Sequence, residues 1–164
     1  MKNRNLDHKD HWMTPGSFYD LLDKEHNFNF DPCPYHHDTD KWDGLEVDWK
    51  ERNFINPPYS QKLKDLFVKK AIFESYKGKL CVLLIPVSTS TKLFHNYILP
   101  NIARPIEYVR GRIPFIGINA KGQKVNYPEP IKDLTIEFEG ETIPMHVKNS
   151  GQHDSMIVIF DGRP

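Results

Sequence analysis

The chain has 164 residues, enough for one domain with a hydrophobic core, and its 38% hydrophobic and 27% charged residues exclude a disordered or fibrous chain. Its formal net charge of +0 excludes a strongly basic domain, the usual footprint of nucleic-acid binding, but not local basic patches. The longest apolar run, residues 80–87, is too short to span a bilayer, and residues 1–11 lack the apolar core of a secretory signal. We therefore expect a cytoplasmic protein with no membrane partner, in which Cys33 and Cys81 are reduced thiols.

The first predicted elements are a helix and a short strand. Thr14-Pro15 is typical of a helix start, with Thr as N-cap and Pro at the first helical position, and apolar residues at helical spacing continue to about Lys24. Residues 28–30 favour a short strand, which the two prolines of Asp31-Pro32-Cys33-Pro34 end. The polar stretch 35–50, which has intermittent apolar anchors, predicts a structured loop.

Strands and helices continue to alternate along the rest of the chain. Residues 80–85 form a continuous apolar run, which is typical of a strand buried on both faces of a sheet. The other predicted elements are a strand at 53–55, a helix that Ser60 caps and that ends near Gly78, a helix from the cluster 88–91 to Pro100, and strands at 106–109 and 156–160. This alternation favours an α/β sheet with helices on its faces.

Residues 116–152 break the alternation. The segment contains several glycines and prolines around one β-like stretch, 134–138. A stretch of this length without a helix is usually a functional loop or disordered. We expect a single domain over residues 1–164, in which 116–152 form an insertion or a long hairpin.

The tetrapeptide Asn56-Pro57-Pro58-Tyr59 follows the predicted strand at 53–55, at the place where open α/β sheets bind their ligands. Its prolines have no N–H, so the backbone offers carbonyl acceptors, and Asn56 adds a side-chain oxygen. An exocyclic amine can donate one proton to Asn56 and the other to the Pro57 carbonyl, which frees the nitrogen lone pair for attack. Tyr59 can stack on a planar base, worth roughly 1–3 kcal/mol, and this helps to offset the cost of flipping the base out of a duplex. A simple turn is the alternative interpretation of these four residues.

This tetrapeptide and five other motifs together resemble the phage-type, Dam-like DNA adenine-N6 methyltransferases. In chain order the other motifs are Thr14-Pro15 with Phe18, Phe30-Asp31-Pro32-Cys33, Leu84-Ile85-Pro86, Gly111-Arg112-Ile113-Pro114-Phe115 and Ser155-Met156-Ile157-Val158-Ile159-Phe160. The resemblance covers roughly residues 11–116 and 153–162. It implies a reduced Rossmann-like fold of S-adenosylmethionine-dependent methyltransferases, a single sheet with flanking helices, in the cytoplasm of a bacterium or a phage-infected host. It also implies methyl transfer from S-adenosylmethionine to adenine N6 in double-stranded DNA with base flipping, although the tetrapeptide alone would equally suit cytosine N4.

The resemblance implies roles for two groups of residues, and clusters of basic residues indicate a third. Cofactor contacts are expected from Thr14, Pro15, Phe18, Phe30, Asp31, Pro32, Asp43, Gly44 and Leu45. Among them, Asp31 is expected near the ammonium group of the cofactor. The adenine is expected at Asn56, Pro57, Pro58 and Tyr59. DNA contacts are expected from residues 116–152 and from Ser60, Lys62, Lys64, Arg110 and Arg112. A solvated charged surface is the other interpretation of these basic residues.

Two other functions are open at this point. The chain departs from the full methyltransferase pattern, because Cys33-Pro34 stands where Gly-x-Gly is usual and only 24 residues, 32–55, separate Asp31 from Asn56. A methyltransferase-like module without activity, which binds DNA or a protein, would explain this departure and the neutral charge.

A metal-dependent nuclease is the second open function. It could use Cys33, His36, His37 and Asp38, whose residue types suit zinc. Because no Cys-x-x-Cys and no second paired cluster accompany them, we favour a polar loop and expect no metal. The cluster 88–91 likewise favours a helix cap over contacts with DNA phosphates.

Overall fold

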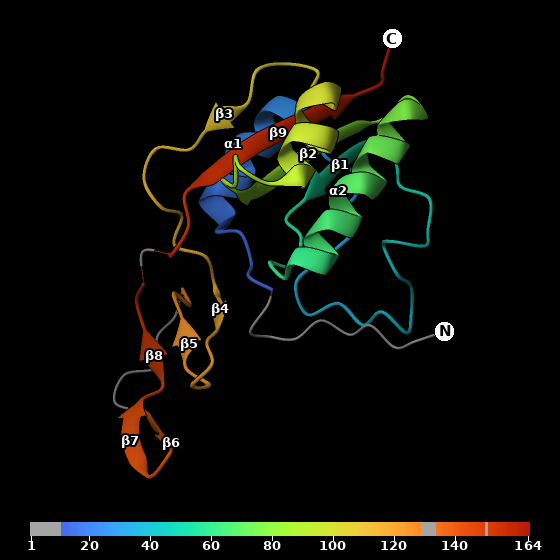
Figure 1. The fold of residues 1–164 in the computed structure, drawn as a ribbon. Coiled ribbons are helices and arrows are strands. Elements are labelled where there is room, and N and C mark those ends of the chain that lie inside the picture. Colours follow the sequence, from blue (N-terminus) through green and yellow to red (C-terminus); the bar gives the residue numbers. More distant parts are fainter. Residues whose placement is uncertain (1–10, 129–133, 150) are drawn as a thin grey trace.

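The computed structural model describes residues 11–128, 134–149 and 151–164, which form a mixed α/β fold with a main sheet and a smaller lobe (Figure 1). The elements are, in chain order, α1 (Gly16–His26), β1 (Arg52–Ile55), α2 (Gln61–Tyr76), β2 (Leu80–Pro86), η1 (Leu93–Ile98), η2 (Leu99–Asn101), β3 (Glu107–Tyr108), β4 (Gly117–Ile118), β5 (Lys124–Val125), β6 (Thr135–Phe138), β7 (Glu141–Pro144), β8 (His146–Val147) and β9 (Ser155–Asp161). Within these ranges, none of the helices is both long and apolar enough to cross a membrane.

Four strands form the main sheet, in the order β1-β2-β9-β3. β1 and β2 are parallel, whereas β9 runs antiparallel to β2, and β3 runs antiparallel to β9. The chain at Phe30 adds a parallel bridge to Asn53, on the side of β1 away from β2. The strand predicted at 28–30 is reduced to this bridge, because the next bond of a parallel ladder would need an N–H at Pro32.

Two hydrophobic clusters cover the two faces of the main sheet. Side chains of β2 alternate between them: Cys81 and Leu83 pack in the cluster that includes α2, whereas Val82 and Leu84 pack in the cluster that includes α1. Figure 1 shows the two helices on opposite sides of the sheet. The strands predicted at 80–85 and 156–160 are confirmed as β2 and β9, and both are buried along almost their whole length.

Two of the predicted helices differ from the observed ones. α1 begins at Gly16 with Pro15 at the N-cap position, so Thr14 is not the cap. The helix predicted from 88–91 to Pro100 begins later and consists of the π-helix η1 followed by the 3-10 helix η2. Only Thr91 of the predicted capping cluster has a described capping bond, in which its hydroxyl accepts from the Phe94 N–H at 3.2 Å.

The segment 116–152, apart from 129–133 and 150, which lie outside the described residues, forms the lobe. It contains a three-stranded sheet, β4-β5-β8, and the two-stranded hairpin β6-β7. Figure 1 shows the lobe extending away from one end of the main sheet. The single sheet implied by the resemblance is therefore wrong for the chain as a whole. The pairing of β5 with the distant β8 is parallel, and local periodicity gives no sign of such a contact.

Candidate active site

The tetrapeptide Asn56-Pro57-Pro58-Tyr59 connects the end of β1 to the beginning of α2. Its first three residues are buried and Tyr59 is half-buried. β1 has β2 on one side and the Phe30 bridge on the other, and both neighbours run parallel to it. The tetrapeptide therefore leaves the sheet at a carboxyl edge that is flanked on both sides, which is where open α/β sheets bind ligands.

The side chain of Asn56 is held in one orientation. Its Nδ2 donates to the Trp12 carbonyl oxygen at 2.6 Å and to the Thr14 hydroxyl at 3.1 Å. A main-chain carbonyl can only accept, so the amide nitrogen, not the oxygen, must face Trp12. Asn56 Oδ1 is buried and has no hydrogen-bond partner among the described residues. An unpaired buried acceptor is costly, so this atom is suited to receive a donor from outside the chain.

The contact with Asn56 explains why Thr14 is not a helix cap. The Thr14 hydroxyl accepts from Asn56 Nδ2, and the Pro15 carbonyl instead begins the helix by accepting from the N–H groups of Phe18 and Tyr19. The predicted cofactor residue Thr14 and the predicted catalytic residue Asn56 are thus in direct contact. The side chain of Phe18 packs in the same hydrophobic cluster as Tyr59.

A second group of predicted site residues lies on the turn after Phe30. Asp31 Oδ1 accepts from the Cys33 N–H at 2.9 Å, and burial raises the pKa of Asp31 to about 7. Gly44 packs on this turn so closely that a Cβ atom there would lie 1.8 Å from the Pro32 carbonyl oxygen. The structure therefore brings the turn at Asp31 and the loop at Gly44 together, although they are separate in the sequence.

The loop around Gly44 is itself ordered by hydrogen bonds. Asp43 Oδ1 accepts from the Leu45 N–H at 2.8 Å, and the Trp49 indole N–H donates to the Gly44 carbonyl oxygen at 2.7 Å. The side chain of Leu45 is partly buried against the cluster on the α2 face. Only a glycine can occupy position 44 in this arrangement, because any side chain would collide with the backbone of the turn.

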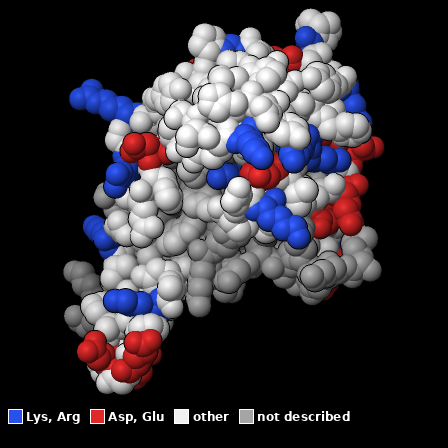
Figure 2. Space-filling view, in the orientation of Figure 1, with Lys and Arg blue, Asp and Glu red and all other residues white. Residues whose placement is uncertain are grey.

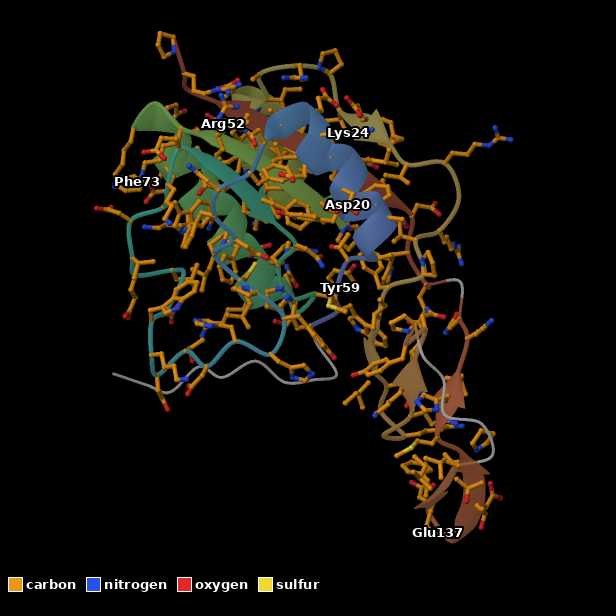
Figure 3. The ribbon with its side chains drawn as sticks, turned by 180° about the vertical axis from the view of Figure 1, so that it is seen from behind. Asp20, Lys24, Arg52, Tyr59, Phe73 and Glu137 are labelled. Carbon is orange, nitrogen blue, oxygen red and sulfur yellow. The ribbon has the colours of Figure 1, made fainter. Side chains whose placement is uncertain are left out.

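A cavity of about 530 Å³ adjoins the tetrapeptide at Tyr59. Its aromatic walls are Trp12, Tyr59 and Phe115, with the ring of His153 nearby. The Tyr59 ring meets the Phe115 ring edge to face at 5.8 Å and the His153 ring at 6.1 Å. Figure 3 shows Tyr59 at the junction between the main sheet and the lobe. Sequence reasoning did not assign Trp12, Phe115 or His153 to the site, although Phe115 ends one of the motifs that carry the resemblance.

Residues 12–13 connect this site to the lobe. Met13 forms an antiparallel bridge with Ile116, in which the two N···O distances are 2.7 and 3.0 Å. Gly117, the first residue of β4, packs against the ring of Trp12, and a Cβ atom there would lie 2.6 Å from the ring. The residue whose carbonyl orients Asn56 therefore also supports the beginning of the lobe.

The residues expected to contact DNA lie in two separate places. At the beginning of α2, Ser60 and Lys62 are exposed and Lys64 is half-buried. Arg110 and Arg112 are exposed on the turn after β3. Because β3 runs parallel to β1, both groups follow strands that end at the same edge of the main sheet.

The histidines and the cysteine considered for a metal have other contacts. The Cys33 thiol donates to the Asn56 carbonyl oxygen at 3.3 Å, and His37 Nε2 lies 2.7 Å from the Trp42 carbonyl oxygen. Over the described ranges, no group of three or more His, Cys, Asp or Glu side chains is placed to hold a metal ion.

A model of the family described as DNA N-6-adenine-methyltransferase (Dam) matches residues 2–156, which is nearly the whole chain. No curated protein and no solved structure matches the chain. The family match covers both the tetrapeptide and the lobe.

Proposed function

This chain belongs to the DNA N-6-adenine-methyltransferase (Dam) family, and we propose that it is an active enzyme that methylates adenine N6 in double-stranded DNA, with the target base flipped out of the duplex. The observation that carries this proposal is the buried Oδ1 of Asn56, which has no hydrogen-bond partner among the described residues. An amide oxygen that is fixed and unpaired is complementary to an amine donor.

Asn56 acts through its two amide atoms. Nδ2, held by Trp12 and Thr14, fixes the side chain, and Oδ1 accepts one proton of the adenine amine. The Pro57 carbonyl accepts the second proton, because the prolines leave the tetrapeptide rich in acceptors and poor in donors. Together the two bonds draw the nitrogen toward tetrahedral geometry and direct its lone pair. Alignment of this kind is the main task of the protein when the methyl donor is already activated.

The cavity between Trp12, Tyr59 and Phe115, which we call the aromatic cavity, binds the flipped base. Its volume of about 530 Å³ is within the range of small-molecule sites. Stacking on Tyr59, Phe115 or Trp12 contributes roughly 1–3 kcal/mol per base, which offsets much of the cost of about a few kcal/mol for extruding it. Burial raises the pKa of Tyr59, so its phenol stays neutral and presents an uncharged ring to the base.

The residues on the turn at Asp31 fit S-adenosylmethionine as the cofactor. The Asp31 carboxyl complements the ammonium group of the cofactor, and the close packing at Gly44 shapes the neighbouring loop. Residues proposed to hold the cofactor are Thr14, Pro15, Phe18, Phe30, Asp31, Pro32, Asp43 and Leu45. When bound, S-adenosylmethionine supplies a methyl group on a positively charged sulfonium.

The topology of the main sheet supports a reduced Rossmann-like fold. β2, β1 and the chain at Phe30 run parallel, so their carboxyl ends lie at one edge. The tetrapeptide and the turn at Asp31 both follow these carboxyl ends. Cofactor and target base would therefore be bound at the same edge, as the rule for open α/β sheets requires.

Tritiated methyl transfer from S-adenosylmethionine to DNA tests this function. We expect transfer by the wild-type chain and a loss of about 100- to 1,000-fold in Asn56→Ala, comparable to the removal of one preorganised hydrogen-bonding group from an active site. Asn101→Ala is the matched control, because its side-chain hydrogen bonds with Tyr76 and Tyr97 are exposed. Thermal melting of both variants establishes that they are folded.

Two outcomes would contradict the proposal. Transfer by Asn56→Ala at the wild-type rate would remove Asn56 from the mechanism. A folded wild-type chain that binds DNA but neither binds S-adenosylmethionine at millimolar concentration nor transfers methyl groups would be the inactive methyltransferase-like module.

A further inference from the structure

A second cavity, of about 630 Å³, lies between the beginning of α2, the end of β2 and η1, and we refer to it as the lysine cavity. The residues that matter to its chemistry are Gln61, Lys64, Asp65, Lys69, Ser88 and Lys92. It shares no lining residue with the aromatic cavity at Tyr59. It is therefore a separate hollow with its own walls.

The lysine cavity is positively charged although the whole chain is neutral. Three lysines and one acid, Asp65, line it, while the formal net charge of the chain is +0. Within the described part of the chain, Lys64, Lys69 and Lys92 form no ion pair. The Lys69 Nζ lies 4.6 Å from the centre of the Tyr97 ring, which attracts a cation without neutralising it. Figure 2 shows several basic side chains on the face that α2 and η1 form.

Other lysines near the end of α2 differ from these, because they are paired with a buried carboxylate. Glu74 is completely buried, and the Nζ atoms of Lys70 and Lys77 lie 2.9 and 3.5 Å from its Oε1, while Lys79 binds its Oε2. Burial pushes the pKa of Glu74 up, but the hydrogen bonds from Lys79 and Lys70 outweigh this, so the net pKa is lowered. These lysines stabilise the fold, whereas the lysines of the cavity have no such partner and are available to an external anion.

The lysine cavity lies next to the tetrapeptide at the same edge of the sheet. Ile55, the last residue of β1, is opposite Leu83 on β2, and two residues further along β2 Ile85 begins the wall of the cavity. Neighbouring strands are about 4.8 Å apart, so the cavity begins roughly one strand away from the tetrapeptide. On the other wall, Gln61 follows Tyr59 by two residues, which limits their Cα separation to about 7.6 Å.

We propose that the lysine cavity binds a backbone phosphate of the substrate DNA, next to the nucleotide whose base enters the aromatic cavity. This assignment rests on the proposed function. Lysine is a point-charge ligand for phosphate, and serine and asparagine side chains also contact phosphate oxygens in DNA complexes. A phosphate held here fixes the strand beside the extruded nucleotide and so positions the target amine at Asn56. The walls offer cations, the Ser88 hydroxyl and the Asn96 amide, and Lys69 lies over the ring of Tyr97.

A salt titration of DNA binding by the full chain tests the phosphate site. The test variant is Lys64→Gln/Lys92→Gln, and the control Lys41→Gln/Lys50→Gln removes the same charge from exposed lysines outside both cavities. Each lysine that neutralises a phosphate contributes about 0.9 to the slope of log K against log salt. Because the cavity holds one phosphate, we expect the test variant to lose about 0.9 from the magnitude of the slope and the control to lose much less. Equal slopes in the two variants would overturn the proposal.

Two further measurements distinguish a free anion from DNA as the ligand, and a failure of the phosphate site from a failure of the proposed function. Calorimetry with inorganic phosphate detects a free-anion site: binding at millimolar phosphate that the test variant loses, with no change in DNA slope, would assign the cavity to a free anion and overturn the DNA assignment. If the wild-type chain neither binds nor methylates DNA, the proposed function itself fails. If it does both and only the slope is unchanged, the proposed function stands and the phosphate site fails.

A neutral methylphosphonate, placed singly at phosphates around the target adenine, locates the contact. At the phosphate that the lysine cavity binds, the substitution should lower the DNA affinity of the wild-type chain. The test variant should be insensitive there, because the lysines that bind this phosphate are already absent. Equal sensitivity of both proteins at every position would contradict the assignment of the lysine cavity.

Discussion

The raised pKa of Asp31 makes the stability of the fold depend on pH. Burial raises the pKa of Asp31 to about 7, above the ordinary value of about 3.9. Between these two pH values, the folded chain keeps a proton on Asp31 that the unfolded chain has released. The stability that this group contributes is therefore fully present below about pH 4 and is lost as the pH rises to about 7. A cofactor ammonium group, in contrast, requires the ionised carboxylate.

Affinity for S-adenosylmethionine should therefore depend on pH through Asp31. Below about pH 7 the carboxylate must lose its proton before it binds the cofactor, so affinity should fall about tenfold per pH unit and reach a plateau above pH 7. Asp31→Asn should bind weakly at all pH values and lack this dependence. Calorimetry from pH 5 to pH 8 measures both, and the same pH profile in wild type and Asp31→Asn would contradict the role of Asp31.

The residue types of the tetrapeptide favour an amine site, but they do not indicate how Asn56 is oriented. The prolines and Asn56 are adjacent, so their acceptors are visible in the sequence. The orientation of Asn56 depends on Trp12 and Thr14, which are 44 and 42 residues away and contact it only in the folded chain. Thr14 also has the local signature of an N-cap, but its hydroxyl is hydrogen-bonded to Asn56 instead and Pro15 is at the N-cap position.

Among the elements, the segment at Trp12 links the lobe to the Asn56 side chain, and Gly117 tests this link. A Cβ atom at position 117 would lie 2.6 Å from the Trp12 ring, so Gly117→Ala must displace the ring or β4. The Trp12 carbonyl orients Asn56, so we expect the rate of methyl transfer to fall about 10- to 100-fold, as small misplacements in active sites do.

Gly16→Ala is the control for this substitution, because nothing lies within 4 Å of a Cβ atom at Gly16. Single-turnover rates at saturating DNA and cofactor separate the chemical step from binding. A Gly117→Ala rate equal to that of Gly16→Ala would show that the lobe and Asn56 are not coupled through Trp12.

Elements defined by local patterns could be predicted, and those defined by distant pairing could not. The apolar runs of β2 and β9 were visible because burial on both faces leaves a local signature. Helix α2 was also predicted, and Ser60 is at its N-cap position, but the predicted capping hydrogen bond from the Ser60 side chain is not found. The lobe depends on pairing between β5 and β8, and these two strands, of two residues each, are too short to show alternation. The β-like stretch at 134–138, in contrast, is found as the four-residue strand β6. The π-helix η1 differs from an α-helix in its hydrogen bonding rather than in the residues it prefers.

For the whole molecule, the neutral sum of charges hides a separation of charge in space. Basic side chains line the lysine cavity, whereas Glu137, Glu139 and Glu141 are exposed on the hairpin β6-β7. Figure 3 shows Glu137 at the far end of the lobe from the main sheet. Composition could not predict this arrangement, because it depends on which residues the fold brings to one edge. The same edge carries the tetrapeptide, the turn at Asp31 and the lysine cavity.

Identification of the methylated nucleoside is the sharpest test of adenine N6 methylation by this chain. The full chain is incubated with S-adenosylmethionine and double-stranded DNA, and the DNA is digested to nucleosides and analysed by mass spectrometry, with Asn56→Ala in parallel. We expect N6-methyldeoxyadenosine from the wild-type chain and a loss of about 100- to 1,000-fold in the variant. N4-methyldeoxycytidine as the product, or no methylated nucleoside from a folded wild-type chain that binds DNA, would contradict it.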